Sequence, residues 1–299
     1  MKRFINLILR GGRIMSVVAL IIAFCGGVVA AVTGALQACM LAGIMGILVY
    51  IFPKASLLSN MLTAGFIPYV SFGGCVVATA YAANIRKFEL AGTDIHKSLY
   101  GPRKDVSVLC VSGIFAVLGY VVTYSLSSIK IPIIDMGSMW CIASEVFARY
   151  FFGHKDLINT EFKSIPRYKN QKREWFFYAF WGAVIGLLAS FIVVKTGNMN
   201  LPFFISLASL IFMFIDGNFP ATHHISMTAA YAVVASGGNI LVGAIFGALA
   251  EITRIFCADV LNTKVSTHLD PPATTIGILS VVIFILFKII WLCKVNMKD

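Results

Sequence analysis

Proline, histidine and hydroxyl side chains interrupt a long apolar stretch in the C-terminal half of the chain. Pro220, Thr222, His223, His224 and Ser226 follow one another within seven residues. A helix that begins after Pro220 would present unpaired backbone N–H groups beside two imidazoles, and such a helix start attracts anions and carboxylates. The pattern therefore predicts a binding site for a small polar or anionic solute. The alternative is that one histidine only packs or bonds a neighbouring carbonyl group.

A similar interruption lies in the first half and contains Pro68, Ser71, Gly73 and Gly74. Its Gly-x-x-Pro run aligns with that of the C-terminal stretch at one offset, and a Tyr-Ala pair follows in both stretches. Transporters with duplicated membrane folds place broken helices at equivalent positions around a central binding site. We therefore expect the two interruptions to line one site.

Each half also has an aspartate directly before a later apolar segment. Asp135 and Asp270 hold these positions, and His268 lies two residues before Asp270. An aspartate at a helix start can accept bonds from free N–H groups and faces the positive end of the helix dipole. We expect these residues to contact substrate or form a gate, whereas a plain capped helix start is the alternative. The predicted binding residues are Pro68, Ser71, Gly73, Gly74, Asp135, Pro220, Thr222, His223, His224, Ser226, His268 and Asp270.

Histidine and aspartate are also metal ligands and acid–base catalysts. Ligand types alone would allow a metal at His223, His224, His268 and Asp270, but no regular ligand spacing supports one. The sequence has no nucleophile elbow, phosphate loop or zinc-protease motif. We therefore expect no metal, no cofactor and no catalysis. An enzyme that uses His223 and Asp270 as acid and base is the alternative.

Two pairs of opposite charges lie inside apolar segments. Glu145 and Arg149 are four residues apart and Glu251 and Arg254 are three apart, so each pair shares one helix face. Ionisable groups within membrane segments cost roughly 2.5–3.5 kcal/mol each and are therefore candidates for function. Mutual neutralisation inside the bundle is the expected role, with a proton relay through Glu251 as the alternative.

The composition is that of an integral membrane protein. The 299 residues are 59% hydrophobic and 12% charged, with a mean hydropathy of +0.88, whereas soluble domains carry about 25% charged residues. The segments are continuously apolar and do not alternate, which favours helices over a β-barrel. These features predict an all-α polytopic membrane protein with the lipid bilayer as a partner.

The formal charge of +11 comes from lysines and arginines that cluster beside the apolar segments. The clusters lie in the N-terminal tail, in residues 84–105, in residues 153–174 and near the C-terminus. Basic clusters in short loops are typical of cytoplasmic loops, so no nucleic-acid partner is expected. We predict a first membrane repeat at 1–152, a basic cytoplasmic linker at 153–174 and a second membrane repeat at 175–299.

Ten apolar segments can be placed, about five in each half. If all four basic regions are cytoplasmic, one segment in each half must fail to cross. The best candidates are 62–83 and 219–236, because each is interrupted by proline and rich in small residues. We therefore expect two tandem repeats in the same orientation, each with about four transmembrane helices plus one broken or re-entrant segment. Both termini would be cytoplasmic in a bacterial inner membrane, and ten full spans in two inverted repeats are the alternative.

Three short stretches resemble the HPP family of small integral membrane proteins. Residues 267–273 (THLDPPA) are similar to the family's His-Pro-Pro run, with Leu269 and Asp270 between the histidine and the prolines. Residues 98–103 (SLYGPR) resemble its Pro-Arg loop, and residues 71–74 (SFGG) resemble its small-residue helix start. The first half has Met-Gly where the second has Pro-Pro. The resemblance implies a compact bundle of about four spans per copy and a role in moving small anions such as nitrite.

Together these features predict a membrane transporter, permease or channel for a small polar or anionic solute, with its site between the two repeats at the broken helices. The main alternative is a non-catalytic membrane subunit that docks partners through its basic cytoplasmic loops. A membrane-embedded His/Asp enzyme is a further alternative. A homo-oligomeric state is left open by the sequence.

Overall fold

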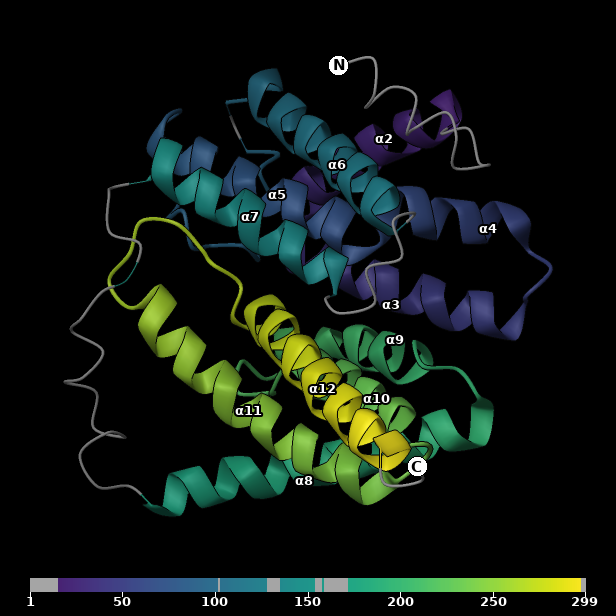
Figure 1. Cartoon of the computed structure of the whole chain (residues 1–299). Coiled ribbons are helices and arrows are strands. Elements are labelled where there is room, and N and C mark those ends of the chain that lie inside the picture. The colour runs from purple at the N-terminus through teal and green to yellow at the C-terminus, as the bar shows by residue number, and fades with distance from the viewer. Residues whose placement is uncertain (1–15, 102, 128–134, 154–157, 159–171, 297–299) are drawn as a thin grey trace.

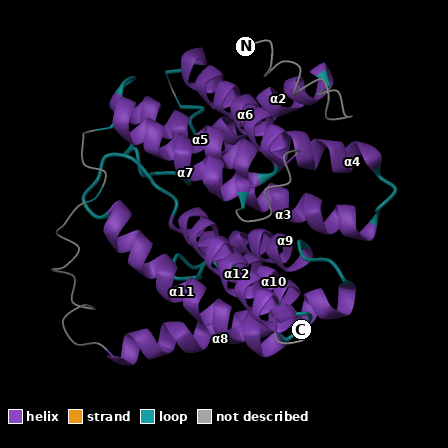
Figure 2. Ribbon diagram, in the orientation of Figure 1, coloured by secondary structure: helices purple, strands orange, loops and turns teal. Residues whose placement is uncertain are grey.

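The computed structural model describes residues 16–101, 103–127, 135–153, 158 and 172–296. These residues form helices joined by loops and contain no strand (Figure 2), which confirms the all-α prediction. Most of the predicted linker 153–174 lies outside them, and that boundary stays a prediction. The helices are α2 (Val17–Thr33), α3 (Ala35–Ile51), α4 (Ser56–Met61), α5 (Pro68–Asn84), α6 (Val106–Ser127), α7 (Met136–Phe151), α8 (Lys172–Thr196), α9 (Leu201–Ala208), α10 (His223–Ala235), α11 (Ile240–Asn262) and α12 (Pro271–Asn296).

Two irregular helical segments extend these helices. The π-helix η1 (Leu62–Phe66) joins α4 to α5, and the 3₁₀-helix η4 (Ser209–Phe214) follows α9. Counted with them, five helices of the described chain are long and apolar enough to cross a membrane. Their ranges are Ser56–Asn84, Val106–Ser127, Lys172–Thr196, Ile240–Asn262 and Pro271–Lys288.

The outer faces of these helices are apolar. On α11, Leu241 and Ile245 are one turn apart, and 64% and 59% of their surfaces are exposed. The interior is instead packed with small side chains, such as the fully buried Ala30, Ala38 and Ala42. Because transmembrane helices associate through small residues and have no need of a polar exterior, this distribution matches a protein surrounded by lipid.

The two halves repeat one arrangement of helices (Figure 1). In the first half α2 packs on α5 and α6, and α5 packs on α7. In the second half α8 packs on α10 and α11, and α10 packs on α12. The halves meet where α3 contacts α9 and where α7 contacts α12. Each of these contacts joins an element to its own counterpart, as a two-fold axis requires.

Counterpart helices run in opposite directions. The backbone N–H of Asp135, at the start of α7, donates to Ser280 Oγ within α12. Farther along α7, Glu145 accepts from the backbone N–H of Asp270, at the start of α12. The two helices are therefore antiparallel, and the two-fold axis that relates them is perpendicular to both.

The contact between α3 and α9 has the same geometry. Gly43 of α3 faces Ala208 near the end of α9, and Gly46, farther along α3, faces Phe204 nearer the start of α9. The absence of a side chain at both glycines lets the helices approach closely. The expectation of two repeats in the same orientation is thus wrong, and the inverted alternative describes the helix directions.

Residues 85–101 and 103–105 belong to a loop at one end of the bundle. The N–H of Leu99 donates to Ala31 O of α2 at 2.8 Å. Arg86 Nε donates to Asp105 Oδ2 at 2.6 Å, and hydrogen bonds from Ser107 and Arg86 hold the pKa of Asp105 below its ordinary value. The loop therefore marks the end of the bundle at which α2 and α5 finish.

The described chain begins and ends at the opposite end of the bundle. Helix α2 starts there (Figure 1). Helix α12 starts beside the loop after α5, where the N–H of His268 donates to Gly92 O, and runs from that loop toward the opposite end. The start of α2, which the N-terminal basic cluster precedes in the sequence, and the basic loop after α5 are therefore at opposite ends of the bundle. The premise that made one segment per half stop short of crossing does not hold.

The two segments expected to be re-entrant differ from each other. Residues 62–83 fall within the continuous run Ser56–Asn84, which is long enough to cross. Its irregularity is the π-helix η1 and a non-helical Ile67 before Pro68, which is tolerated as a first helical residue. Residues 219–236 are broken as expected, since α10 has 13 residues and follows the non-helical stretch 216–222.

Candidate functional site

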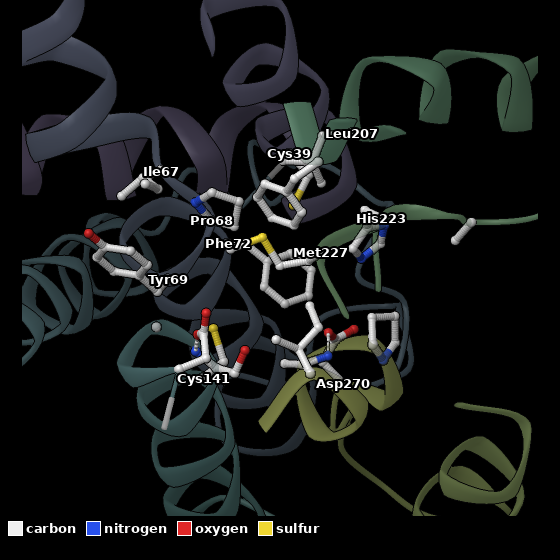
Figure 3. Close-up of a pocket in the computed structure, with 18 of the residues that line it drawn as sticks. Cys39, Ile67, Pro68, Tyr69, Phe72, Cys141, Leu207, His223, Met227 and Asp270 are labelled. Carbon is white, nitrogen blue, oxygen red and sulfur yellow. Dashed lines mark hydrogen bonds between the residues drawn. The ribbon is translucent and has the colours of Figure 1, made fainter. Parts of the chain in front are cut away.

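A cavity of about 270 Å³ lies where the two repeats meet (Figure 3). The first turns of α5, α7, α10 and α12 reach its wall, as do residues of α3 and α9. Two of these helices are counterparts of the other two, so the cavity lies on the two-fold axis. Its lining consists of Leu36, Cys39, Ile67, Pro68, Tyr69, Phe72, Asp135, Gly137, Ser138, Cys141, Asn200, Phe203, Phe204, Leu207, Met213, Ala221, His223, Met227, Asp270, Pro272, Ala273 and Ile276.

Asp135 caps α7 at the cavity wall. Its Oδ1 accepts from the N–H of Ser138 at 2.6 Å, and its Oδ2 accepts from the hydroxyl of Tyr231 on α10. A carboxylate with two oxygens has about four acceptor positions. Asp135 therefore keeps acceptor capacity for a donor inside the cavity after both of these bonds are made.

Asp270 caps α12 in the same way and is only 8% exposed. Its Oδ2 accepts from the N–H of Ala273 at 2.7 Å, and its Oδ1 lies 3.4 Å from His268 Nε2. Its own N–H donates to Glu145 Oε2 at 2.7 Å. The other oxygen of Glu145 is buried without a hydrogen-bond partner. Glu145 thus lies buried beside the start of α12, next to Asp270.

Arg149 holds the connection that precedes α12. Its guanidinium donates to the backbone oxygens of Leu261 and Thr267, both at 2.6 Å, and to Thr267 Oγ1 at 3.0 Å. The side chain is almost entirely buried. An arginine in the first half therefore fixes the chain just before Asp270 in the second half, a role that helix-face spacing with Glu145 did not indicate.

His223 is the first residue of α10 and lines the cavity. Its Nδ1 is buried without a hydrogen-bond partner, and its ring contacts that of Phe203 at a centroid distance of 6.2 Å. No side chain caps the start of α10 at Thr222. Figure 3 shows His223 and Asp270 on one side of the cavity and Tyr69 on the other.

His224 points away from the cavity into the second repeat. Its Nε2 lies 2.8 Å from Glu251 Oε2, and Arg254 donates to both oxygens of Glu251. His224 and Glu251 are buried, whereas the side chain of Arg254 is 27% exposed. Adjacent helix positions differ by about 100°, so only one of the two histidines reaches the cavity, as the structure shows.

Of the twelve predicted residues, Pro68, Asp135, His223 and Asp270 line the cavity. The others support the helices around it. Ser71 donates to Phe66 O at the break before α5, and Ser226 donates to Thr222 O in the first turn of α10. Gly73 and Gly74 pack α5 against α7 and α6, Pro220 belongs to the stretch before α10, and His268 lies beside Asp270.

Most of the apolar lining was not predicted. Tyr69, Phe72, Phe203 and Phe204 lie within one turn of Pro68 or Pro202. Proximity to a helix-starting proline was the available signal. In a chain with 24 phenylalanines, however, an aromatic residue beside a proline is not informative without the structure.

A larger cavity of about 720 Å³ borders the central one and is here called the vestibule. Tyr69 and Gly137 line both cavities. The vestibule is bounded by α2, α4, η1, α6 and the start of α7, at the end of the bundle where α2 begins. Its wall includes the hydroxyl groups of Tyr120, Thr123 and Tyr124. Tyr69 therefore stands between the central cavity and a more polar space near one end of the protein.

Among the described residues, no group of three or more histidine, cysteine, aspartate or glutamate side chains is arranged to hold a metal ion. The cavity contains two cysteines and one histidine in its lining, but they do not gather into such a group. Its chemistry is that of carboxylates and helix starts in an apolar surrounding.

One family model matches the chain twice, over residues 10–166 and 159–295. The two matches divide the chain as the helices do and meet near the connection between α7 and α8. No curated protein and no solved structure matches the chain. The comparisons give no link to the HPP family, so that resemblance stays a prediction. Because the two matches cover nearly its whole length, the chain belongs to the family of unknown function DUF7973.

Proposed function

We propose that this protein is an integral membrane transporter or channel for a small polar solute, which binds in the cavity between two inverted repeats. The observation that carries the proposal is the position of that cavity. Helix starts from both repeats converge on it, and two carboxylates and a histidine line it in an otherwise apolar chain. Inverted repeats with broken helices around a site near the membrane midplane are an arrangement that secondary transporters use.

Membrane insertion is part of the same proposal. The apolar outer faces and the five long helices of the described chain support it. We place the protein in a bacterial inner membrane with both termini on one side. The four lysines and arginines in the first 13 residues favour the cytoplasm for that side, because charges flanking the first helix usually set the orientation.

The test is solute flux into proteoliposomes that contain the purified full-length protein. The panel would cover small anions, amines, amino acids, sugars and nucleobases, with empty liposomes as the control. Flux that His223→Ala or Asp270→Asn reduces, while each variant remains folded by circular dichroism, would support transport through this cavity.

A different result would favour a docking subunit. If the folded protein moved none of these solutes, and charge reversal at Lys169, Lys172 and Arg173 removed its association with partner proteins, the transport proposal would be wrong. The basic connection between the repeats would then be the functional surface.

A further inference from the structure

The central cavity displays both signs of charge at separate places on its wall. Asp135 and Asp270 supply carboxylates, and no lysine or arginine of the described chain lines the cavity. The positive counterpart comes from helix starts, which carry roughly half a unit charge each. A solute with only negative charge would therefore face two carboxylates without a cationic side chain to offset them.

The carboxylates neutralise only two of the helix starts. Asp135 and Asp270 cap α7 and α12 through bonds to Ser138 and Ala273. The start of α10 has no side-chain cap, and beside it the Nδ1 of His223 is buried without a partner. The first N–H groups of a helix have no intrahelical acceptor, so this corner of the cavity can receive a carboxylate.

The rest of the wall is apolar. Phe72, Phe203, Phe204, Leu207, Met227 and Ile276 form much of the lining. The volume of about 270 Å³ is below the range of drug-sized pockets, roughly 300–1,000 Å³, and so fits one small molecule. Aromatic faces near an ammonium group would add cation–π attraction.

We infer that the solute is a small zwitterion with an apolar body, such as an α-amino acid with an apolar side chain. This inference rests on the proposed function and specifies its substrate class. The ammonium group lies beside the carboxylate of Asp270, which is on the same side of the cavity as His223 (Figure 3). The carboxylate lies at the start of α10 beside His223, and the apolar side chain packs among Phe72, Phe203 and Leu207.

The test is equilibrium binding to the purified full-length protein with three matched probes. L-leucine carries both charged groups, 3-methylbutylamine lacks the carboxylate, and 4-methylpentanoate lacks the amine. We expect L-leucine to bind about tenfold or more tightly than either analogue, because each analogue loses hydrogen bonds to a charged group. L-methionine and L-phenylalanine extend the test to other apolar side chains.

Substitutions assign each end of the probe. Asp270→Asn should weaken L-leucine about tenfold and should not weaken 4-methylpentanoate, which has no ammonium group and is repelled by the carboxylate that the substitution removes. Asp135→Asn should have the smaller effect, because Asp135 lies level with Ser280, ten residues along α12 from Asp270. His223→Ala should weaken L-leucine and 4-methylpentanoate but not 3-methylbutylamine. Asp216→Asn removes a carboxylate from an exposed turn outside the cavity and is the matched control, with no change expected for any probe.

Several outcomes would overturn the inference. If 4-methylpentanoate bound as tightly as L-leucine, the site would recognise an anion, and if 3-methylbutylamine did, it would recognise a cation. If none of the three amino acids bound while another solute crossed the membrane of proteoliposomes, the inferred substrate class would be wrong and the transport proposal would remain supported. If no solute of the wider panel crossed, the proposed function itself would fail.

Discussion

Asp135 and Asp270 occupy the same position in two helices that run in opposite directions. Each carboxylate accepts from the N–H three residues later, and each backbone N–H donates to the partner helix, to Ser280 in one case and Glu145 in the other. The pair thus obeys the two-fold relation in both its caps and its cross-helix bonds. The acceptors differ, however, since a hydroxyl stands in one repeat where a carboxyl stands in the other.

This relation predicts how the two aspartates respond to substitution. Asn caps helices about as well as Asp, so Asp135→Asn and Asp270→Asn should keep the fold while they weaken solute binding. Asp135→Ala and Asp270→Ala should in addition lose about 1 kcal/mol of stability. Thermal unfolding in detergent separates the two effects. Equal unfolding temperatures for the Asn and Ala variants would contradict the capping role.

The inverted arrangement predicts on which side of the membrane each loop lies. The loop between α5 and α6 and its counterpart between α10 and α11 should lie on opposite sides. Lys97→Cys and Ala235→Cys place exposed thiols near these two connections. An impermeant thiol reagent applied to intact cells should label one of them and not the other, with the parent protein as the background control. Labelling of both from the same side would instead mean that the repeats share one orientation.

Tyr69 should control passage between the vestibule and the central cavity, because it lines both. Tyr69→Ala removes the ring and should let solute leave the cavity faster, measured as loss of retained solute from preloaded proteoliposomes. Tyr69→Phe keeps the ring and should behave as the parent protein. If both variants retained solute equally well, the boundary would lie elsewhere.

The cluster of His224, Glu251 and Arg254 should stabilise the second repeat. Glu251→Ala leaves a buried histidine and a largely buried arginine without their shared partner, and removal of one member of a buried ion pair costs about 3–5 kcal/mol. The partial exposure of Arg254 places the expected loss near the lower value. Asp94→Asn, which breaks the exposed contact with Lys97, is the control and should change stability by less than about 1 kcal/mol. An unfolding temperature unchanged by Glu251→Ala would show that the cluster contributes nothing to the fold.

Gly43 should be essential for the contact between the repeats. A methyl group there would overlap the backbone of α9 at Ala208, and overpacking of a tight contact costs about 1–3 kcal/mol. Gly217→Ala is the matched control, because nothing lies within 4 Å of a methyl group at that position. Thermal unfolding compares the two alanine variants. Similar losses of stability for both would show that the contact does not depend on Gly43.

Local chemistry made part of the site predictable. Asp135 and Asp270 were found because an acidic residue before an apolar run is a helix-start pattern, and His223 because it follows Pro220. The choice between His223 and His224 was not open to sequence reasoning, since it depends on which helix face meets the partner repeat. The aromatic lining lacked any signal that separates it from lipid-facing phenylalanines.

The orientation of the repeats could not be predicted for a different reason. The orientation depends on whether the segment around Pro68 crosses the bundle. The six residues of α4 (SLLSNM) extend that segment to a full span through the π-helix η1, but their mixed composition gave no apolar run to count. The positions of the basic clusters then pointed to the wrong topology, because the start of α2, just after the first cluster, and the loop that holds the second cluster are at opposite ends of the bundle.

The vestibule is lined by α6, and the matching positions of α11 in the second repeat carry different side chains. When Ile114-Phe115 of α6 is aligned with Ile245-Phe246 of α11, Tyr120 and Thr123 of its wall correspond to Glu251 and Arg254. If the two repeats exchanged conformations, the opposite end would open beside those two charges, and water would reach them. The two states would therefore differ in how much hydrated charge they expose. The resting population of the protein, and the side to which it offers its cavity, should then change with ionic strength.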